Sequence, residues 1–172
     1  LESNAGSVSI TIATVNDAPV VSDITSQSVD EDNVFTYTVE ALDIDGDDLL
    51  YFADADANSL VTIADNLLTV TPDADFNGDI VVTVTVSDGQ YSDSDEFTLT
   101  VNAVNDAPIL SDVTSQSVDE DGLFTYSLSV LDIDGDNLSY SADLSASGTA
   151  NITGNILTII PDADFNGDIV VT

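Results

Sequence analysis

The sequence predicts an all-β chain built from tandem seven-stranded Greek-key sandwiches. Apolar and polar residues alternate with a period of two in several segments, as at Phe35, Tyr37 and Val39, which favours strands over helices. Turns rich in Asp, Asn and Gly separate these segments. Seven short strands of this kind within one repeat are typical of a two-sheet Greek-key sandwich.

The chain repeats itself with a constant shift of 89 residues. Asn16-Asp17-Ala18-Pro19 recurs from Asn105 onward, and the residues from Pro72 to Thr83 recur unchanged from Pro161 to Thr172. A fixed shift without gaps indicates that one structural unit occurs more than once, so the repeat decides the domain organisation.

The repeat divides the chain into three parts. Residues 1–15 align with residues 90–104, the end of a repeat. We therefore expect residues 1–15 to be the last strand of a preceding repeat, 16–104 a complete repeat, and 105–172 a second repeat truncated before its last strand. There is no initiator Met and no signal-peptide pattern, which indicates a segment of a longer product.

The complete repeat accounts for seven strands, taken in order. The first is the stretch after Pro19, and the second is the alternating segment that begins at Phe35. Three short apolar stretches follow, and Asp65-Asn66 predicts a tight hairpin turn between the last two. Two long alternating segments come after the loop that contains Asn77-Gly78. The expected strands are residues 20–29, 35–41, 49–53, 60–64, 67–71, 80–86 and 97–101.

The charge of the chain limits its partners. It carries 33 acidic side chains and no Lys, Arg or His, for a formal net charge of −33. Its apolar content of 43% still argues for a folded chain. No side chain can neutralise phosphate, which excludes nucleic acid and anionic membranes as partners. The charge has to be balanced from solution.

Acidic clusters at fixed loop positions indicate that a divalent cation supplies this balance. In a sandwich the loops gather at two ends, which we call the top and the bottom of each repeat. The loop between the second and third strands, with Asp43 and Asp45, belongs to the top, whereas Glu31 and Asp75 belong to the bottom. The linker Asn105-Asp106 leaves the bottom of one repeat and enters the top of the next, so acids from consecutive repeats should converge there.

Ca²⁺ matches this donor set best, because it takes six to eight oxygen ligands from carboxylates, amides and carbonyls. Mg²⁺ prefers a smaller octahedron with retained waters, and Zn²⁺ is disfavoured without His or Cys. Isolated acids such as Asp54, Asp56, Asp93 and Asp95 are expected to be solubilising charge. The candidate calcium ligands are Asn16, Asp17, Asp30, Glu31, Asp43, Asp45, Asp47, Asp73, Asp75, Asn105, Asp106, Glu120, Asp132, Asp134 and Asp136.

These motifs resemble the bacterial cadherin-like tandem repeats of large secreted or surface adhesins. The resemblance is carried by Asn16-Asp17-Ala18-Pro19, Asp43-Ile44-Asp45-Gly46-Asp47, Pro72 through Gly78, and Ser87-Asp88-Gly89. It implies a cadherin-like sandwich, export from the cell, and a function as a calcium-rigidified spacer in cell adhesion or biofilm. Its partners would be neighbouring repeats of the same chain.

The resemblance also implies ligands at the junction between repeats. The positions similar to those of true cadherins are Glu31, Asp73, Asp75, Asn102, Asn105, Asp106, Asp132 and Asp134. Cadherin linkers carry Asp where this chain has Asn102, and a basic residue where it has Ala74. With fewer linker charges, we expect one or two ions per junction.

Two other function classes stay open from the sequence. The chain could be a subunit of an extracellular filament, in which Val8–Ile12 of one molecule completes the last sandwich of an identical neighbour by strand addition. The simpler interpretation of the incomplete repeats at the two ends of the sequence is that it is a segment cut from a longer array. An enzyme is disfavoured, because no His, Cys or Lys is present as base or nucleophile.

Overall fold

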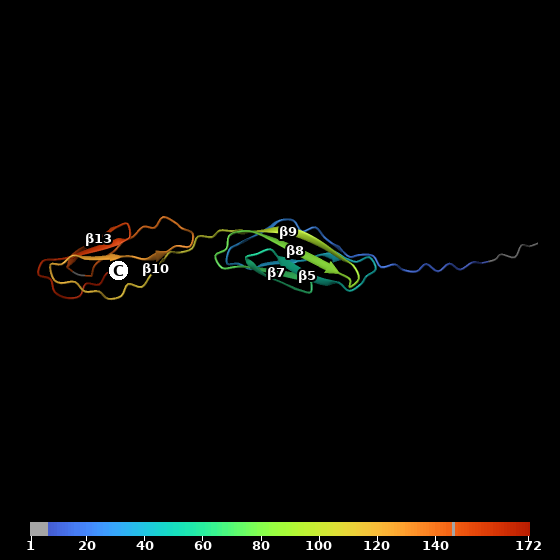
Figure 1. Cartoon of the computed structure of the whole chain (residues 1–172), viewed down its shortest axis with the longest axis horizontal. Coiled ribbons are helices and arrows are strands. Elements are labelled where there is room, and N and C mark those ends of the chain that lie inside the picture. Colours follow the sequence, from blue (N-terminus) through green and yellow to red (C-terminus); the bar gives the residue numbers. More distant parts are fainter. Residues whose placement is uncertain (1–6, 146) are drawn as a thin grey trace, which may run out of the picture. The chain divides into compact units, whose positions relative to one another are not determined.

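The protein consists of strands and turns, without a helix, in the part that the computed structural model describes, residues 7–145 and 147–172. It divides into two compact units, unit 1 (Leu1–Val104) and unit 2 (Asn105–Thr172), which Figure 1 colours from blue to yellow-green and from yellow to red. The predicted all-β tandem sandwich is confirmed. Among the described residues, no helix has the length and apolarity needed to span a membrane.

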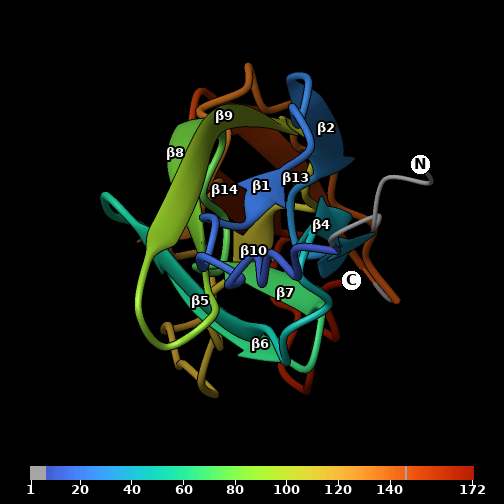
Figure 2. The same cartoon turned by 90° about the vertical axis from the view of Figure 1, so that its right-hand side faces the viewer.

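Unit 1 is a sandwich of two main sheets. One has the order β2-β9-β8-β5 and the other β3-β7-β6, while β1 and β4 form a short additional pair. Figure 2 shows β8 and β9 on one side of the unit and β6 and β7 on the other. The strands are β1 (Val20–Val21), β2 (Gln27–Asp30), β3 (Phe35–Thr38), β4 (Ala41–Leu42), β5 (Leu50–Ala55), β6 (Ser59–Ala64), β7 (Leu67–Pro72), β8 (Gly78–Ser87) and β9 (Ser92–Asn102).

The core lies between the two sheets and follows the alternation of the sequence. Ile80, Val82, Val84 and Val86 of β8 are fully buried, and the residues between them face outward or are half-buried. From the opposite sheet, Leu68 and Val70 of β7 are also fully buried. Val39, Phe97 and Leu99 complete the same cluster, and the ring of Phe76 packs against its edge. Burial of alternate residues from both sheets is what stabilises such a sandwich.

The first predicted strand is in fact two strands that belong to different sheets. β1 pairs antiparallel with β4, and β2 pairs in parallel with β9. Val21 and Ile24 are both buried although they are three residues apart, which a regular strand with a period of two does not allow. The chain therefore bends between them and crosses from one sheet to the other.

At this crossing the carboxylates of Asp93 and Asp95 accept hydrogen bonds from backbone N–H groups. The prediction that these residues are only solubilising charge was therefore wrong. The Val21 N–H donates to Asp93 Oδ2 at 3.0 Å, and the Ile24 N–H donates to Asp95 Oδ2 at 2.6 Å. Asp56 acts similarly, since its Oδ1 accepts a hydrogen bond from the Val81 N–H at 3.1 Å. A buried N–H without an acceptor costs free energy, so these carboxylates replace missing ladder bonds.

The described part of unit 2 repeats the β3-β7-β6 sheet and the β1–β4 pair of unit 1. β10 (Ile109–Leu110) pairs with β12 (Val130–Leu131), and the three-stranded sheet has the order β11 (Phe124–Ser127), β14 (Ile156–Pro161), β13 (Gly148–Thr153). Its core is small and centres on Leu128, Leu157 and Ile159. Only the isolated bridge Leu144–Val171 represents the β5–β8 pairing of unit 1 among the described residues.

We expect Asp95→Ala to destabilise unit 1, because it leaves the Ile24 N–H without its acceptor at a cost of about 1–3 kcal/mol. Thermal denaturation followed by circular dichroism measures the change. The control is Glu96→Ala, which removes the same charge from an exposed side chain of the same strand. Equal melting temperatures for the two variants would contradict the assigned role.

Candidate metal centre

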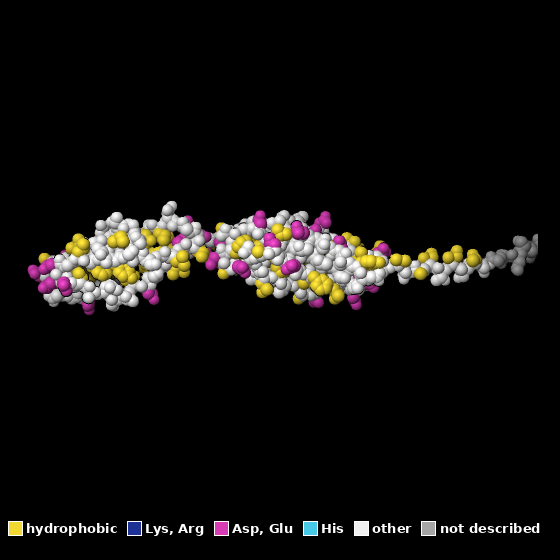
Figure 3. Space-filling model, viewed as in Figure 1, with side chains coloured by type: hydrophobic (Ala, Val, Ile, Leu, Met, Phe, Trp, Pro, Cys, Tyr) yellow, Lys and Arg dark blue, Asp and Glu magenta, His cyan; other side chains and the backbone are white. Residues whose placement is uncertain are grey.

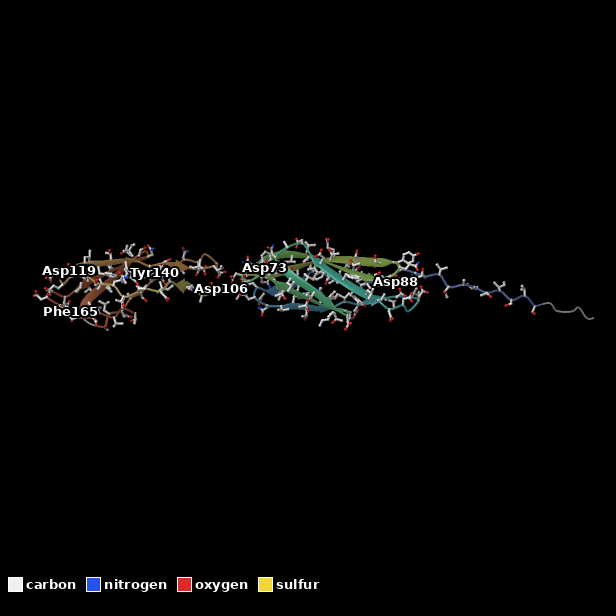
Figure 4. The ribbon with its side chains drawn as sticks, turned by 60° about the horizontal axis from the view of Figure 1, so that its bottom comes forward. Asp73, Asp88, Asp106, Asp119, Tyr140 and Phe165 are labelled. Carbon is white, nitrogen blue, oxygen red and sulfur yellow. The ribbon has the colours of Figure 1, made fainter. Side chains whose placement is uncertain are left out.

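The surface charge of the protein is of one sign. Figure 3 shows acidic side chains but no basic ones on the face in view, as the composition requires. In unit 1 the acidic motifs occupy opposite ends, and Figure 4 labels Asp88 at one end and Asp73 at the other. The top contains the β4–β5 and β8–β9 loops, and the bottom contains the β2–β3 and β7–β8 loops.

The β4–β5 loop at the top of unit 1 is wound around the carboxylate of Asp43. Asp43 Oδ1 accepts hydrogen bonds from the backbone N–H groups of Asp45, Gly46 and Asp47 at 2.9, 3.0 and 3.3 Å. Gly46 has a φ of 81°, which glycine adopts without strain. The loop thereby holds its other acidic side chains around a fixed centre.

Three carboxylates converge at this centre. One oxygen each from Asp43, Asp47 and Asp88 lies within 4.8 Å of the other two. We call Asp43, Asp47 and Asp88 the top triad. Its members come from two loops, because Asp88 lies at the end of β8 and the other two follow β4. Three oxygens at this separation can share one cation.

Four hydrogen bonds hold Asp88 in place, three within the β8–β9 turn and one from the segment before β1. Its Oδ1 accepts hydrogen bonds from the N–H groups of Gln90 and Tyr91, each at 2.6 Å. Its Oδ2 accepts one from Asn16 Nδ2 at 2.8 Å. The Asp88 N–H itself donates to the Tyr91 carbonyl at 3.3 Å. The triad member is thus pre-positioned by both its own turn and the segment that precedes β1.

Two members of the triad have opposite pKa shifts. Partial burial raises the pKa of the Asp47 carboxyl, and the charges of Asp43, Asp45 and then Asp88 raise it further. The hydrogen bonds from Tyr91 and Gln90 lower the pKa of Asp88, and Asn16 adds to this effect against an opposing contribution from burial. Negative charge is therefore crowded at Asp47, and a bound cation would relieve that repulsion.

One carboxylate oxygen of Asp43 receives no hydrogen bond from the protein. Asp43 is only 8% exposed, and its Oδ2 is buried without a hydrogen-bond partner. Buried carboxylate oxygens are normally satisfied by donors or by metal ions. The chemistry of this position, an ionisable oxygen beside two further carboxylates, fits a hard cation such as Ca²⁺.

The segment before each unit's first strand joins the same loop. The Asp17 N–H donates to Asp45 Oδ2 at 2.8 Å in unit 1. In unit 2 the Asp106 N–H donates to Asp134 Oδ2 at 2.6 Å, and the Asp136 N–H donates to Asp132 Oδ1 at 2.8 Å. The structure therefore places the Asn-Asp motif beside the Asp-x-Asp loop within each unit.

The bottom of unit 1 is tied together by two carboxylates. Glu31 is buried, and its Oε1 accepts a short hydrogen bond from the Val104 N–H, while the Glu31 N–H donates to the Asn102 carbonyl. Asp32 Oδ1 accepts a hydrogen bond from the Asp75 N–H at 3.2 Å. The β2–β3 loop is thus hydrogen-bonded to both the β7–β8 loop and the segment that follows β9.

The remaining predicted ligands are less closely associated with these contacts. Asp30 Oδ1 accepts a hydrogen bond from Asn102 Nδ2 at 3.0 Å. Asp73 is exposed and contributes its backbone to the β7–β8 loop, where its carbonyl accepts a hydrogen bond from the Phe76 N–H. Asn105 donates from Nδ2 to the Asp106 carbonyl. Glu120 is exposed at the bottom of unit 2, where Asp121 Oδ1 instead accepts from the Asp164 N–H.

Sequence reasoning missed Asp88 as a member of the top triad. The residue stands alone between Ser87 and Gly89, so no local Asp-x-Asp pattern marks it. The signal that could have found it is the placement of the last loop at the top, beside the loop of Asp43 and Asp47. That placement follows from the topology that the sequence predicts.

Comparisons with known proteins agree on the fold. The sequence model of a family described as a bacterial Ig domain matches residues 16–102 and 105–172. No curated protein matches the chain. Among solved structures, Drosophila N-cadherin EC1-4 is 21% identical over 88% of this chain and 43% of its own, with a TM-score of 0.50, a likeness that supports the cadherin-like fold.

Two further structures are more weakly similar. Human protocadherin-24 EC1-2 is 17% identical over 84% of this chain and 80% of its own, with a TM-score of 0.49. An endo-fucoidan hydrolase from glycoside hydrolase family 107 is 21% identical over 85% of this chain, with a TM-score of 0.42. The chain spans only 24% of the hydrolase structure and 43% of the N-cadherin structure.

We expect Asp47→Asn to stabilise the metal-free protein at pH 7. The raised pKa means that the folded state favours protonated Asp47, so its contribution to stability is present at low pH and is lost as the pH rises through the raised pKa. Removing the charge should raise the melting temperature in EGTA at pH 7, and the gain should vanish below pH 3. Asp54→Asn, an exposed acid on β5, is the charge-matched control. An equal gain for both variants would show that repulsion at the triad is unimportant.

Proposed function

Because this chain belongs to the bacterial Ig domain family, with two tandem cadherin-like sandwiches, we propose that it is a calcium-rigidified structural spacer of a large extracellular bacterial adhesin. It would support cell adhesion or biofilm formation by holding other domains away from a cell surface. The proposal assigns no catalytic role to the chain, which has neither His nor Cys. Its partners are neighbouring repeats of the same product.

The observation that carries the proposal is the Asp43 carboxylate. A charged oxygen that is buried without a donor is costly, and here it lies beside the carboxylates of Asp47 and Asp88. A solvated acidic turn would leave its oxygens in water, whereas Asp43 Oδ2 has neither water-facing area nor a protein partner. A cation bound by the triad removes both the orphaned oxygen and the crowding at Asp47.

Calcium is the cation that this donor set supports. All available ligands are oxygens, because the chain has no His or Cys, and Ca²⁺ tolerates the irregular geometry of loop carboxylates and amides better than Mg²⁺ does. Asn16 donates to Asp88 Oδ2 and the Asp17 N–H donates to Asp45 Oδ2, so both residues lie against the loops that carry the triad. Extracellular calcium modules bind with dissociation constants of roughly 10⁻⁴–10⁻³ M, which suits a site filled outside the cell.

The same chemistry extends the proposal to the junction between repeats. Val104 is bound by Glu31 of unit 1 and Asp106 by Asp134 of unit 2. From the acidic motifs of the sequence we propose that carboxylates of consecutive repeats bind a shared ion at the linker, with Asp75 as a further ligand.

The mechanical consequence follows from the sign of the charges. Without metal, carboxylates at a junction repel one another and the linker is free to bend. With Ca²⁺ bound, the β2–β3 and β7–β8 loops of one repeat and the Asp-x-Asp loop of the next are ligands of the same ions. Repeats joined in this way form a stiff spacer whose rigidity depends on extracellular calcium.

Isothermal titration of the whole chain with Ca²⁺ tests the metal sites. At calcium concentrations a hundredfold above the dissociation constant, we expect stabilisation by about 2.7 kcal/mol per site. Asp88→Asn should lower the affinity of the top site by about tenfold, while Asp54→Asn should leave it unchanged. No binding heat and no change in melting temperature at 10 mM Ca²⁺ would refute the proposal.

Small-angle X-ray scattering tests the mechanical role. We expect the distribution of interatomic distances to be narrower and the maximum dimension better defined in Ca²⁺ than in EGTA, because the linker loses its freedom to bend. The double variant Glu31→Gln with Asp134→Asn should behave as if chelated even in calcium. The control with the same charge change is Asp54→Asn with Glu96→Gln. Identical profiles with and without calcium would exclude a calcium-stiffened junction.

A further inference from the structure

The two main sheets of unit 1 differ in the charge of their outer faces. In the β2-β9-β8-β5 sheet, the outward-facing residues include the exposed acids Asp30, Asp54, Asp79 and Glu96. In the β3-β7-β6 sheet, the side chains that alternate with the core residues carry no charge. We call this set the neutral face of unit 1; it consists of Thr36, Thr38, Leu60, Thr62, Ala64, Leu67, Thr69 and Thr71.

The register of the strands arranges the neutral face in rows. Thr69 of β7 lies opposite Thr36 of β3 on one side and opposite Thr62 of β6 on the other. The next row joins Leu67 to Thr38 in the same way. Because adjacent strands are about 4.8 Å apart, the side chains of a row stand next to one another. The neutral face is therefore an ordered array of hydroxyl and methyl groups.

Unit 2 has a neutral face on the equivalent sheet. Its central row places Thr158 of β14 opposite Thr125 of β11 and Asn151 of β13. Six of its eight residues differ from their counterparts 89 positions earlier, and none is charged, although acids make up 19% of the chain and usually lie at such outer positions. The eight residues are Thr125, Ser127, Thr149, Asn151, Thr153, Ile156, Thr158 and Ile160.

The acids beside the neutral face are fewer in unit 2 than in unit 1. Glu40 follows β3, and Asp65 lies in the turn between β6 and β7. The residues 89 positions later are Ser129 and Gly154. Two copies that approach each other through their unit 2 faces therefore meet less repulsion at this end of the sheet than through their unit 1 faces.

The composition of the chain limits which of its surfaces can contact one another. An ionised carboxylate only accepts hydrogen bonds, so two acidic faces repel and cannot satisfy each other without basic side chains, which this chain lacks. The side chains of Thr, Ser and Asn both donate and accept. A face built from them can be satisfied by a second copy of itself, so the neutral face is self-complementary and the acidic face is not.

We propose that the neutral face is a contact surface between copies of this chain, which pack through it sheet against sheet. Stacked sheets lie about 10 Å apart, which brings the hydroxyl groups of the two faces together. Leu60 and Leu67 are 66% and 47% exposed, and Ile156 and Ile160 are 41% and 53% exposed, so their burial provides the driving force. The contact is lateral, adds no strand to either sheet, and goes beyond the spacer function because it does not depend on calcium.

The size of the face indicates a weak contact. Three strands at about 4.8 Å and up to six residues at about 3.3 Å each give a footprint of roughly 14 Å by 20 Å, or on the order of 300 Å² for each unit. Stable interfaces bury about 800 Å² per partner, so one pair of faces associates only at high local concentration. Because each unit carries a neutral face, one chain can contact two others.

Sedimentation equilibrium of the 172-residue chain tests the proposal, in a concentration series up to the millimolar range. The buffer contains 0.5 M NaCl, which screens the net charge of −33, and EGTA, so that calcium takes no part. We expect the average mass to rise with concentration. Thr36→Asp combined with Thr125→Asp, one in each neutral face, should weaken association at least tenfold, because it places carboxylates within the contact.

The control is Ser28→Asp combined with Ser94→Asp, which adds the same charge to exposed positions on the acidic face of unit 1 and should leave association unchanged. Equal weakening by the two pairs of substitutions would overturn the proposal, since it would show that net charge alone governs association. A monomer at all concentrations would also overturn it and would assign the face to a partner other than this chain.

Chemical cross-linking tests the location of the contact. The protein has no Cys, so Thr69→Cys places a single thiol at the centre of the neutral face of unit 1. Thr85→Cys places one on the outer face of β8 in the opposite sheet, and both positions are half-buried. A bismaleimide with an arm of about 10 Å, the separation of stacked sheets, should link Thr69→Cys chains into dimers in much higher yield. Equal yields would contradict a contact through the neutral face.

Discussion

The absence of any basic side chain constrains everything else in this protein. Its carboxylates have no Lys, Arg or His to pair with, so those that are held in place are held mainly by backbone N–H groups and also by neutral side chains such as Asn16. Asp43 caps its own loop, Asp88 caps the β8–β9 turn, and Asp93 and Asp95 hold the strand crossing. Hydrogen bonds to charged groups are stronger than those between neutral groups, so the acids contribute to the fold as acceptors.

In this arrangement backbone N–H groups orient the carboxylates of the acidic loops. In each unit the Asp-x-Asp loop accepts the N–H of the preceding segment, at Asp45 in unit 1 and Asp134 in unit 2. A carboxylate that spends one oxygen on a backbone donor keeps its orientation and offers the other oxygen to a ligand. Asp43 Oδ2 is the clearest instance, since the rest of that side chain is already committed.

Unit 1 and unit 2 share part of their strand pairing. The halves that both units share, namely β3, β6 and β7 and their counterparts β11, β13 and β14, have the same pairings. In the described part of unit 2, the bridge Leu144–Val171 corresponds to the Ala55–Val82 pair of β5 and β8. These pairings join residues that are distant in sequence, so they depend on tertiary structure and not on local pattern.

Sequence alone determined the fold class, the repeat and the acidic loops. Alternation with a period of two and Asp-rich turns are local patterns, which can be recognised without knowing which strands pair. Tertiary structure decided which acids act together. Asp88 joins Asp43 only through the pairing of β8 with β5, and Asp93 is structural only because the first strand crosses between sheets. Neither relation leaves a local pattern, since both depend on which backbone N–H groups the packing leaves without a ladder partner.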